Sequence, residues 1–283
     1  MFIFERVFIF KAFEDNVKIQ IQYESCAVGV LGASLKLKFF FMRVISLVPS
    51  ITEALFDLDL TTDDIVGRTK FCIHPIGVVD KVEIIGGTKN INIDKIKSLK
   101  PDLILANKEE NVKEQVEELM KDFKVLVTNV ETLEDNYYLL KQLGHIFEKE
   151  EKAQFFNLKT YEAFDIPESE KHLKVAYLIW KNPYMTVGGD TFISRILEEL
   201  GFDNLYKNQK RYPEVQLEDL KKANLIFLSS EPFPFKEKHI DEIQEVCPDQ
   251  KIRIVDGEAF SWYGTHLAKC GNYYKELLKG FHQ

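Results

Sequence analysis

From residue 42 onward, short apolar runs alternate with amphipathic stretches of helical period. The runs are rich in β-branched residues and predict strands at 43–48 (RVISLV), 102–106 (DLILA), 125–130 (VLVTNV), 174–179 (KVAYLI), 224–228 (NLIFL) and 252–255 (IRIV). The helical stretches between them end near residue 60 or cover 93–100, 112–121, 191–200, 217–223 and 236–246. Because the strand runs are continuously apolar, both faces of each sheet should be covered.

The same order of elements occurs twice, in residues 42–131 and again in 169–283. Strands that alternate with helices predict parallel sheets joined by right-handed crossovers. We therefore expect an α/β fold with two Rossmann-like lobes. Ligands of such sheets bind beyond the carboxyl ends of the strands, so the loops at those ends are the candidates for function.

Residues 132–168 lie between the halves and keep a helical period of apolar positions, with Pro167 close to their end. This pattern predicts one long α-helix that joins the two lobes. A connector of this kind would act as a stiff hinge with modest opening, unlike a flexible Gly/Ser linker.

The first 41 residues have a different pattern and predict an N-terminal extension. Residues 17–22 and 35–41 could pair as a hairpin. Residues 1–13 are aromatic, but Glu5, Arg6 and Lys11 interrupt them, so no secretory signal is visible. No apolar run reaches the length of about 18 residues that a transmembrane helix needs.

Charge and cysteine spacing exclude several classes of partner and site. The net charge of −8 argues against binding to nucleic acid or to an anionic membrane surface. The four cysteines, Cys26, Cys72, Cys247 and Cys270, lie far apart, which fits neither a zinc site nor a small disulfide scaffold. Buried or idle thiols are the expected state.

The loops at the strand ends are rich in aromatic residues beside Pro and Gly, and they contain both tryptophans, Trp180 and Trp262. Such loops suit a flat or bulky, partly apolar ligand. The alternative is that the aromatic side chains fill the interface between the lobes. The residues of these loops that we expect to bind ligand are Ser50, Phe71, His74, Thr88, Trp180, Tyr184, Glu231, Phe233, Trp262 and Tyr263.

Catalytic motifs are missing from the sequence: it has no G-x-S-x-G elbow, no P-loop and no H-E-x-x-H. Ser50 is interpreted as a helix N-cap, with Glu53 completing a capping box. His74 could be an ordinary loop histidine, a ligand contact, or an imidazole beside a chelated metal. A free metal ion would need more ligands than His74, Cys72 and Glu231. We therefore expect no catalytic residues, no resident metal or cofactor, and no enzyme activity.

Several segments resemble the helical-backbone periplasmic substrate-binding proteins of ABC importers, particularly their vitamin B12-binding branch. The similar segments, which together cover residue 42 to about 275, are 43–53 (RVISLVPSITE), 67–75 (GRTKFCIHP), 86–92 (GGTKNIN), 99–106 (LKPDLILA), 180–184 (WKNPY), 188–193 (GGDTFI) and 260–264 (FSWYG). The resemblance implies two lobes joined by a long helix, with cobalamin or a related corrinoid held between them.

For the site, the resemblance implies ligand contacts from eight of these loop residues, namely Phe71, His74, Thr88, Trp180, Tyr184, Phe233, Trp262 and Tyr263. It also implies docking on an ABC permease and its ATPase through one acidic residue on each lobe. The matching positions are Glu83 and Glu218, which could equally be ordinary solvated glutamates. A monomer is expected.

The sequence leaves alternatives to a corrinoid importer open. The first keeps the fold and binds a ferric siderophore or haem, an interpretation that expects arginines near the ligand; Arg68, Arg195 and Arg211 are the candidates. The second is a cytoplasmic corrinoid-handling protein, or a metal-cluster enzyme on the same two-lobe plan. The resemblance implies a periplasmic location or the outer face of the inner membrane, while the absence of a visible signal peptide keeps a cytoplasmic location open.

Overall fold

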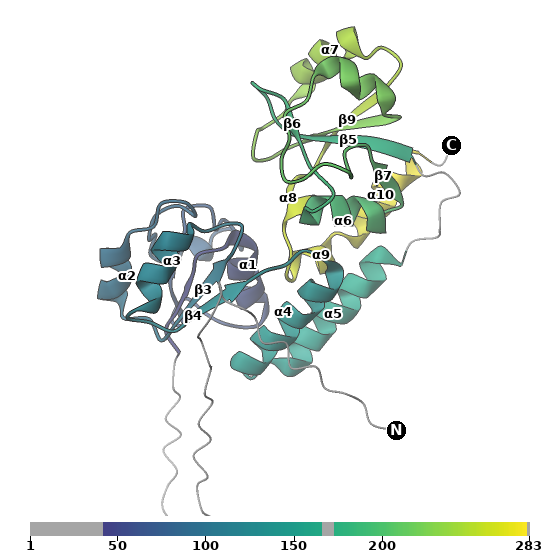
Figure 1. Ribbon diagram of the computed structural model, residues 1–283. Coiled ribbons are helices and arrows are strands. Elements are labelled where there is room, and N and C mark those ends of the chain that lie inside the picture. The colour runs from purple at the N-terminus through teal and green to yellow at the C-terminus, as the bar shows by residue number, and fades with distance from the viewer. Residues whose placement is uncertain (1–41, 166–172, 282–283) are drawn as a thin grey trace, which may run out of the picture. The chain divides into compact units, whose positions relative to one another are not determined.

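The chain divides into two units, residues Met1–Phe41 and Met42–Gln283. The computed structural model describes residues 42–165 and 173–281 (Figure 1). The hairpin expected within residues 1–41 lies outside these ranges, as does Cys26. Both described ranges belong to the second unit.

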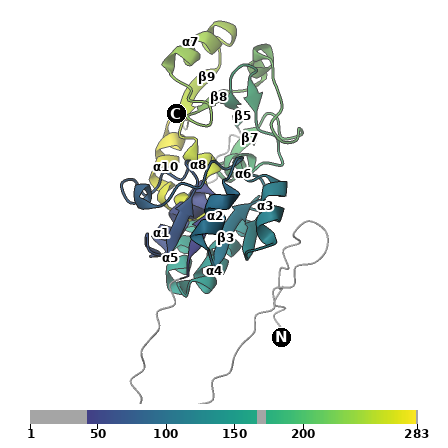
Figure 2. The same cartoon turned by 90° about the vertical axis from the view of Figure 1, so that its left-hand side faces the viewer.

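The N-terminal lobe is built on a four-stranded parallel sheet in the order β2-β1-β3-β4. Its strands are β1 (Val44–Ser46), β2 (Ile65–Arg68), β3 (Leu103–Asn107) and β4 (Val125–Thr128). Successive residues of β3 serve opposite faces: Leu105 joins one apolar cluster with α1 (Pro49–Asp57), and Ile104 and Ala106 join another with α2 (Ile93–Leu99) and α3 (Lys113–Met120). Figure 2 shows α2 and α3 in front of β3. The sheet is therefore covered on both faces, as the continuous apolar runs predicted.

The C-terminal lobe has a five-stranded sheet in which β5 (Leu173–Trp180) pairs in parallel with β8 and β7, and antiparallel with β6. The other strands are β6 (Met185–Thr186), β7 (Phe202–Asn204), β8 (Leu225–Ser229) and β9 (Lys251–Val255). The helices are α6 (Phe192–Glu199), α7 (Glu237–Val246), α8 (Glu258–Ser261), α9 (His266–Lys269) and α10 (Gly271–Lys279). The stretch expected as a helix at 217–223 is a 3-10 helix, η2 (Leu217–Lys222).

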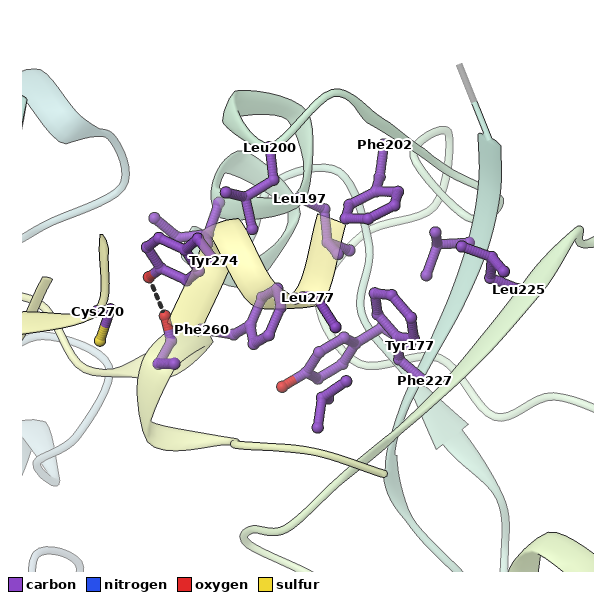
Figure 3. Packing of buried hydrophobic residues seen from close by; sticks show 14 of the residues in the cluster. Tyr177, Leu197, Leu200, Phe202, Leu225, Phe227, Phe260, Cys270, Tyr274 and Leu277 are labelled. Atoms are coloured by element: carbon purple, nitrogen blue, oxygen red, sulfur yellow. Dashed lines mark hydrogen bonds between the residues drawn. The ribbon is translucent and has the colours of Figure 1, made fainter. Parts of the chain in front are cut away.

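One face of this sheet carries the aromatic core of the lobe. Tyr177 on β5 and Phe227 on β8 pack against Phe260 and Tyr274, which come from α8 and α10 (Figure 3). The Tyr274 hydroxyl donates a hydrogen bond to the carbonyl oxygen of Ala259, so the buried phenol is satisfied. This core fixes α8 and the loop after it beside the carboxyl ends of the strands.

The connector between the lobes differs from the single long helix predicted by periodicity. It consists of two helices, α4 (Leu133–Ile146) and α5 (Glu150–Phe164), which lie side by side in both ribbon views. Glu148 in the turn between them has a left-handed φ of 56°. Gly144 permits the close approach, because a Cβ atom there would lie 2.7 Å from the Cβ of Ala153. The helical period of apolar residues continues through the turn in the sequence because each of the two helices buries one apolar side.

Residues 263–265 of the C-terminal half pack against the N-terminal lobe and the connector. Tyr263 is buried in the apolar cluster formed by α1 and α4, and the N–H of Gly264 donates to Oδ1 of Asn136 on α4. Thr265 donates to Asp57 at the end of α1. The two lobes are therefore tied together by this stretch as well as by α4 and α5.

Candidate functional site

Aromatic side chains stand at the carboxyl ends of strands in the C-terminal lobe. Trp180 is the last residue of β5 and is 40% exposed. Its ring meets that of Phe233 edge to face, with 5.8 Å between the ring centroids. The N–H of Phe233 donates to the carbonyl oxygen of Ile179, which fixes the loop after β8 against the end of β5. Tyr184, half-buried, packs with Phe233 in the adjoining apolar cluster.

A hydrogen-bonded group forms in the loops after β8 and β9. Oε1 of Glu231 accepts hydrogen bonds from Nε1 of Trp262, at 3.1 Å, and from Oγ of Ser261, at 2.8 Å. Gly257 leaves the space, because a Cβ atom there would lie 2.5 Å from Cγ of Glu231. Burial raises the pKa of Glu231, and the nearby charge of Glu258 adds to the rise.

His74, in a loop of the N-terminal lobe, contacts this hydrogen-bonded group. Its Nε2 lies 2.9 Å from Oε2 of Glu258, and its ring meets that of Trp262 edge to face at 5.3 Å. The loop that carries His74 is held from inside by Arg68, which donates to the carbonyl oxygens of Val79 and Cys72. Arg68 is thus a structural residue rather than one available to a ligand.

The remaining predicted contacts of the N-terminal lobe lie on two neighbouring loops. The Phe71 side chain is 50% exposed. Its ring lies so close to Gly87 that a Cβ atom on Gly87 would be 3.3 Å from Cε2 of Phe71. Thr88 is buried, and its carbonyl oxygen accepts from Nδ2 of Asn111, which also donates to the carbonyl oxygen of Leu47. Asn111 therefore joins the Thr88 loop to the end of β1.

The loop after β3 adds two carboxylates that the sequence reasoning did not single out. Oδ1 of Asn107 accepts from the N–H groups of Glu109 and Glu110 and shapes this loop. The Glu109 carboxylate pairs with Arg211 of the other lobe and accepts a hydrogen bond from the Tyr212 hydroxyl at 3.3 Å. Burial raises the pKa of Tyr212 to about 12, and it also raises the pKa of Glu110.

A buried ion pair further along the lobe interface was also missed. Glu53 on α1 is 5% exposed, and its carboxylate lies 2.8 Å from Nδ1 of His266 and 2.8 Å from Nζ of Lys269, both on α9. Burial alone would lower the pKa of His266, but hydrogen bonds to Cys270 and Glu53 and the Glu53 charge raise it to about 10. Burial would raise the pKa of Glu53, yet His266 and Lys269 outweigh it and leave that pKa lowered.

Two predicted residues have structural positions that differ from the expectation. Ser50 is not an N-cap: α1 begins after Val48 with no side-chain cap, and Pro49 occupies the first turn. Glu53 accordingly completes no capping box, because its carboxylate turns to His266. Ser50 is 4% exposed. Tyr263 is buried against Phe192 at 5.9 Å between ring centroids, which is the interface-filling position that the sequence left as an alternative.

The expected docking residues lie on different lobes and are both exposed. Glu83 pairs with Lys95, and Glu218 lies in the first turn of η2. Within residues 42–165 and 173–281, no group of three or more His, Cys, Asp or Glu side chains is arranged to hold a metal ion. No helix in that part of the chain is long and apolar enough to cross a membrane.

A sequence profile described as periplasmic binding protein matches residues 44–245. The chain belongs to the periplasmic binding protein family. Among relatives in this family, a vitamin B12-binding protein of Salmonella typhi is 29% identical over 201 residues, which are 69% of this chain and 74% of that protein. The family resemblance stated from the motifs is thereby confirmed, and members of the family are substrate-binding proteins.

Solved structures of similar fold share the two-lobed α/β plan of this family member. The periplasmic vitamin B12 binding protein BtuF of Vibrio cholerae has a TM-score of 0.72 at 20% identity, covering 84% of this chain and 96% of that one. A periplasmic heme binding protein from Pseudomonas aeruginosa also has a TM-score of 0.72, at 15% identity, covering 86% of this chain and 94% of that one. At these identities the likeness concerns the fold, and it confirms the predicted two-lobe architecture.

Proposed function

We propose that this periplasmic binding protein holds a corrinoid, such as cobalamin, between its lobes and delivers it to an ABC permease. The observation that carries the proposal is the combination of aromatic rings and carboxylates on the strand-end loops. Trp180, Phe233 and Phe71 offer apolar surface. The carboxylates of Glu109, Glu231 and Glu258 are bonded within the protein, and each has further lone pairs that can accept a hydrogen bond from a ligand. A corrinoid presents a flat macrocycle surrounded by neutral amides, and amide N–H groups donate well to carboxylates.

The charge of these loops favours a corrinoid over haem or a ferric siderophore. Haem carboxylates and anionic siderophores call for arginine partners. Each arginine within residues 42–165 and 173–281 already bonds to the protein, namely Arg43, Arg68, Arg195, Arg211 and Arg253. The carboxylates of Glu109, Glu231 and Glu258 would repel an anionic ligand. The 29% identity to a vitamin B12-binding protein supports the same choice.

Delivery to a permease would use Glu83 and Glu218, one exposed carboxylate on each lobe. We propose that each pairs with a cationic side chain of the permease, as the family resemblance implies. An exposed ion pair contributes little by itself, typically about 0–1 kcal/mol. Two pairs placed on separate lobes would nevertheless set the orientation of the docked protein and sense the distance between the lobes.

The proposal is tested by fluorescence titration of the full chain with cyanocobalamin, hemin and one ferric siderophore. Cyanocobalamin should quench the tryptophan fluorescence and bind at least about tenfold more tightly than either iron chelate, a difference of about 1.4 kcal/mol. Tighter binding of an iron chelate would overturn the corrinoid assignment. Trp180→Ala should weaken cyanocobalamin binding by about 5- to 50-fold, because the ligand loses an aromatic face.

The matched control is Phe155→Ala, which truncates an aromatic side chain of similar exposure on α5. This variant should bind cyanocobalamin like the wild type. If Trp180→Ala also binds normally, the ligand does not lie against the end of β5 and the proposed site is wrong.

A further inference from the structure

The loops after β3 and β7, which belong to different lobes, meet at an ion pair. Nη1 of Arg211 pairs with Oε1 of Glu109, and the Tyr212 hydroxyl donates to Oε2 of the same carboxylate at 3.3 Å. The three residues lie outside α4, α5 and residues 263–265, which join the lobes elsewhere. Because each carboxylate oxygen has its own partner, the C-terminal lobe holds Glu109 at two points.

The backbone of Arg211 is fixed in an unusual conformation that serves this contact. Its φ of 60° is in the left-handed region, which is unfavourable for a residue with a side chain. The N–H of Arg211 donates to Oδ1 of Asp190 at 2.6 Å, and its carbonyl oxygen accepts from the N–H of Gly188 at 2.7 Å. The guanidinium also lies over the ring of Tyr212, 5.5 Å from its centroid. Strained residues held in place in this way are concentrated at functional positions.

Glu109 is held just as firmly on the other side of the contact. Its N–H donates to Oδ1 of Asn107 at 2.8 Å, and its carbonyl oxygen accepts from Nζ of Lys89. The side chains themselves stay partly open to solvent, with Arg211 54% and Glu109 29% exposed. A pair of this exposure contributes only modestly to stability, so it can break and reform easily.

Both sides of the contact are fastened to loops that carry expected ligand contacts. On the N-terminal lobe, Lys89 reaches Glu109 from the position directly after Thr88. On the C-terminal lobe, the N–H of Val215, close behind Tyr212, donates to the carbonyl oxygen of Tyr184 at 2.9 Å. A ligand that enters or leaves by separation of the lobes therefore has to part these two loops as well.

We propose that Glu109, Arg211 and Tyr212 form a reversible latch that holds the lobes closed over the ligand and breaks when the ligand enters or leaves. The connector and residues 263–265 keep the lobes joined while the latch is open. The latch changes the ratio of open to closed protein, with or without ligand, so it sets the rates of exchange more than the affinity. Its effect on ligand exchange rests on the function proposed above, whereas its effect on the distance between the lobes does not.

The first test measures the distance between the lobes without ligand, by pulsed electron double resonance on the full chain. Nitroxide labels are attached through p-acetylphenylalanine at two exposed positions, 117 on α3 and 245 on α7. Arg211→Glu sets two carboxylates against each other and should raise the ratio of long to short distances by at least about fivefold. Adding Glu109→Arg makes the charges opposite again and should bring the ratio back toward that of the wild type.

Two results of this measurement would overturn the latch. One is a distance distribution in Arg211→Glu that equals that of the wild type. The other is a double variant that stays as open as Arg211→Glu, because the effect would then not come from the pair. Thermal unfolding of each variant verifies that it is folded.

The second test follows the exchange of cyanocobalamin by stopped-flow tryptophan fluorescence. In Arg211→Gln the association and dissociation rates should both rise by about two- to fivefold, while Kd changes by less than about twofold. Arg195→Gln is the matched control, because Arg195 is similarly exposed and pairs with Glu198 within α6. A rise in the dissociation rate alone would show that Arg211 contacts the ligand, and rates equal to the wild type would also refute the latch. If cyanocobalamin does not bind the wild type, the proposed function fails and the distance measurement alone decides on the latch.

Discussion

The buried pair between Glu53 and His266 gives a sharp prediction about stability. Replacing Glu53 by Gln keeps the shape of the side chain but removes the negative charge that faces His266 and Lys269. Both cations then lie at the lobe interface without this partner. Asp57 still pairs with Lys269, so the loss falls mainly on His266.

The size of the effect can be worked from the pKa of His266. Its rise from the ordinary value of 6.5 to about 10 corresponds to roughly 5 kcal/mol in favour of the protonated form in the folded protein. The amide of the variant can still accept a hydrogen bond from the imidazole. We therefore expect Glu53→Gln to lower the free energy of unfolding by about 2–4 kcal/mol, which is typical of breaking a buried pair. For a chain of this length that is a fall in Tm of about 5–15 °C.

The pH dependence separates this mechanism from simple loss of packing. A raised pKa means that the contribution of His266 is fully present below the unfolded value near 6.5 and is lost as the pH rises through about 10. The pKa of Glu53 is lowered from 4.5, so its contribution is present above 4.5 and is lost as the pH falls through the lowered value. The stabilisation by this pair is therefore largest between about pH 4.5 and 6.5.

The assay is thermal unfolding of the wild type and Glu53→Gln at a series of pH values. The difference in Tm should be largest near pH 6 and should shrink toward pH 10. Glu118→Gln serves as control, because its exposed pair with Lys121 should contribute less than about 1 kcal/mol. A difference between wild type and Glu53→Gln that stays constant from pH 6 to 10, or that is below about 0.5 kcal/mol, would refute the reasoning.

Two further predictions concern the connector and the ligand site. Gly144→Ala should destabilise the protein by about 1–3 kcal/mol in urea unfolding, although alanine favours helices, because the added Cβ would overlap the facing Cβ on α5; an unchanged stability would mean that α4 and α5 can move apart freely. In His74→Ala, the visible spectrum of bound cyanocobalamin should match that of the wild-type complex, because Nε2 of His74 is held by Glu258. A spectral difference would instead indicate that His74 coordinates the cobalt.

Local pattern was enough to place the longer strands and the loops after them. The run 174–179 became β5 and the run 224–228 became β8, each within about two residues, because a strand covered on both faces must be apolar throughout. Once the strands were placed, their carboxyl ends put Trp180 and Phe233 among the expected ligand contacts, and in the structure their two rings meet. The strands β2, β6 and β7 were not predicted, because their segments IVGR, MT and FDN contain glycine or polar residues and form no continuous apolar run.

Long-range packing decided the rest. The helical period of apolar positions in residues 132–164 indicated that one side of this segment is buried. It did not indicate that the chain reverses at Glu148, so that α5 packs against α4. In the same way, Glu53 was interpreted as part of a cap because nothing local distinguishes it from one. Its partner His266 lies 213 positions away and meets it only when the C-terminal half returns to α1. Sequence by itself determined which residues must be buried and where strands end, since these depend on neighbours in the chain. Tertiary structure decided which surface or charge meets each buried group, since that depends on segments brought together by folding.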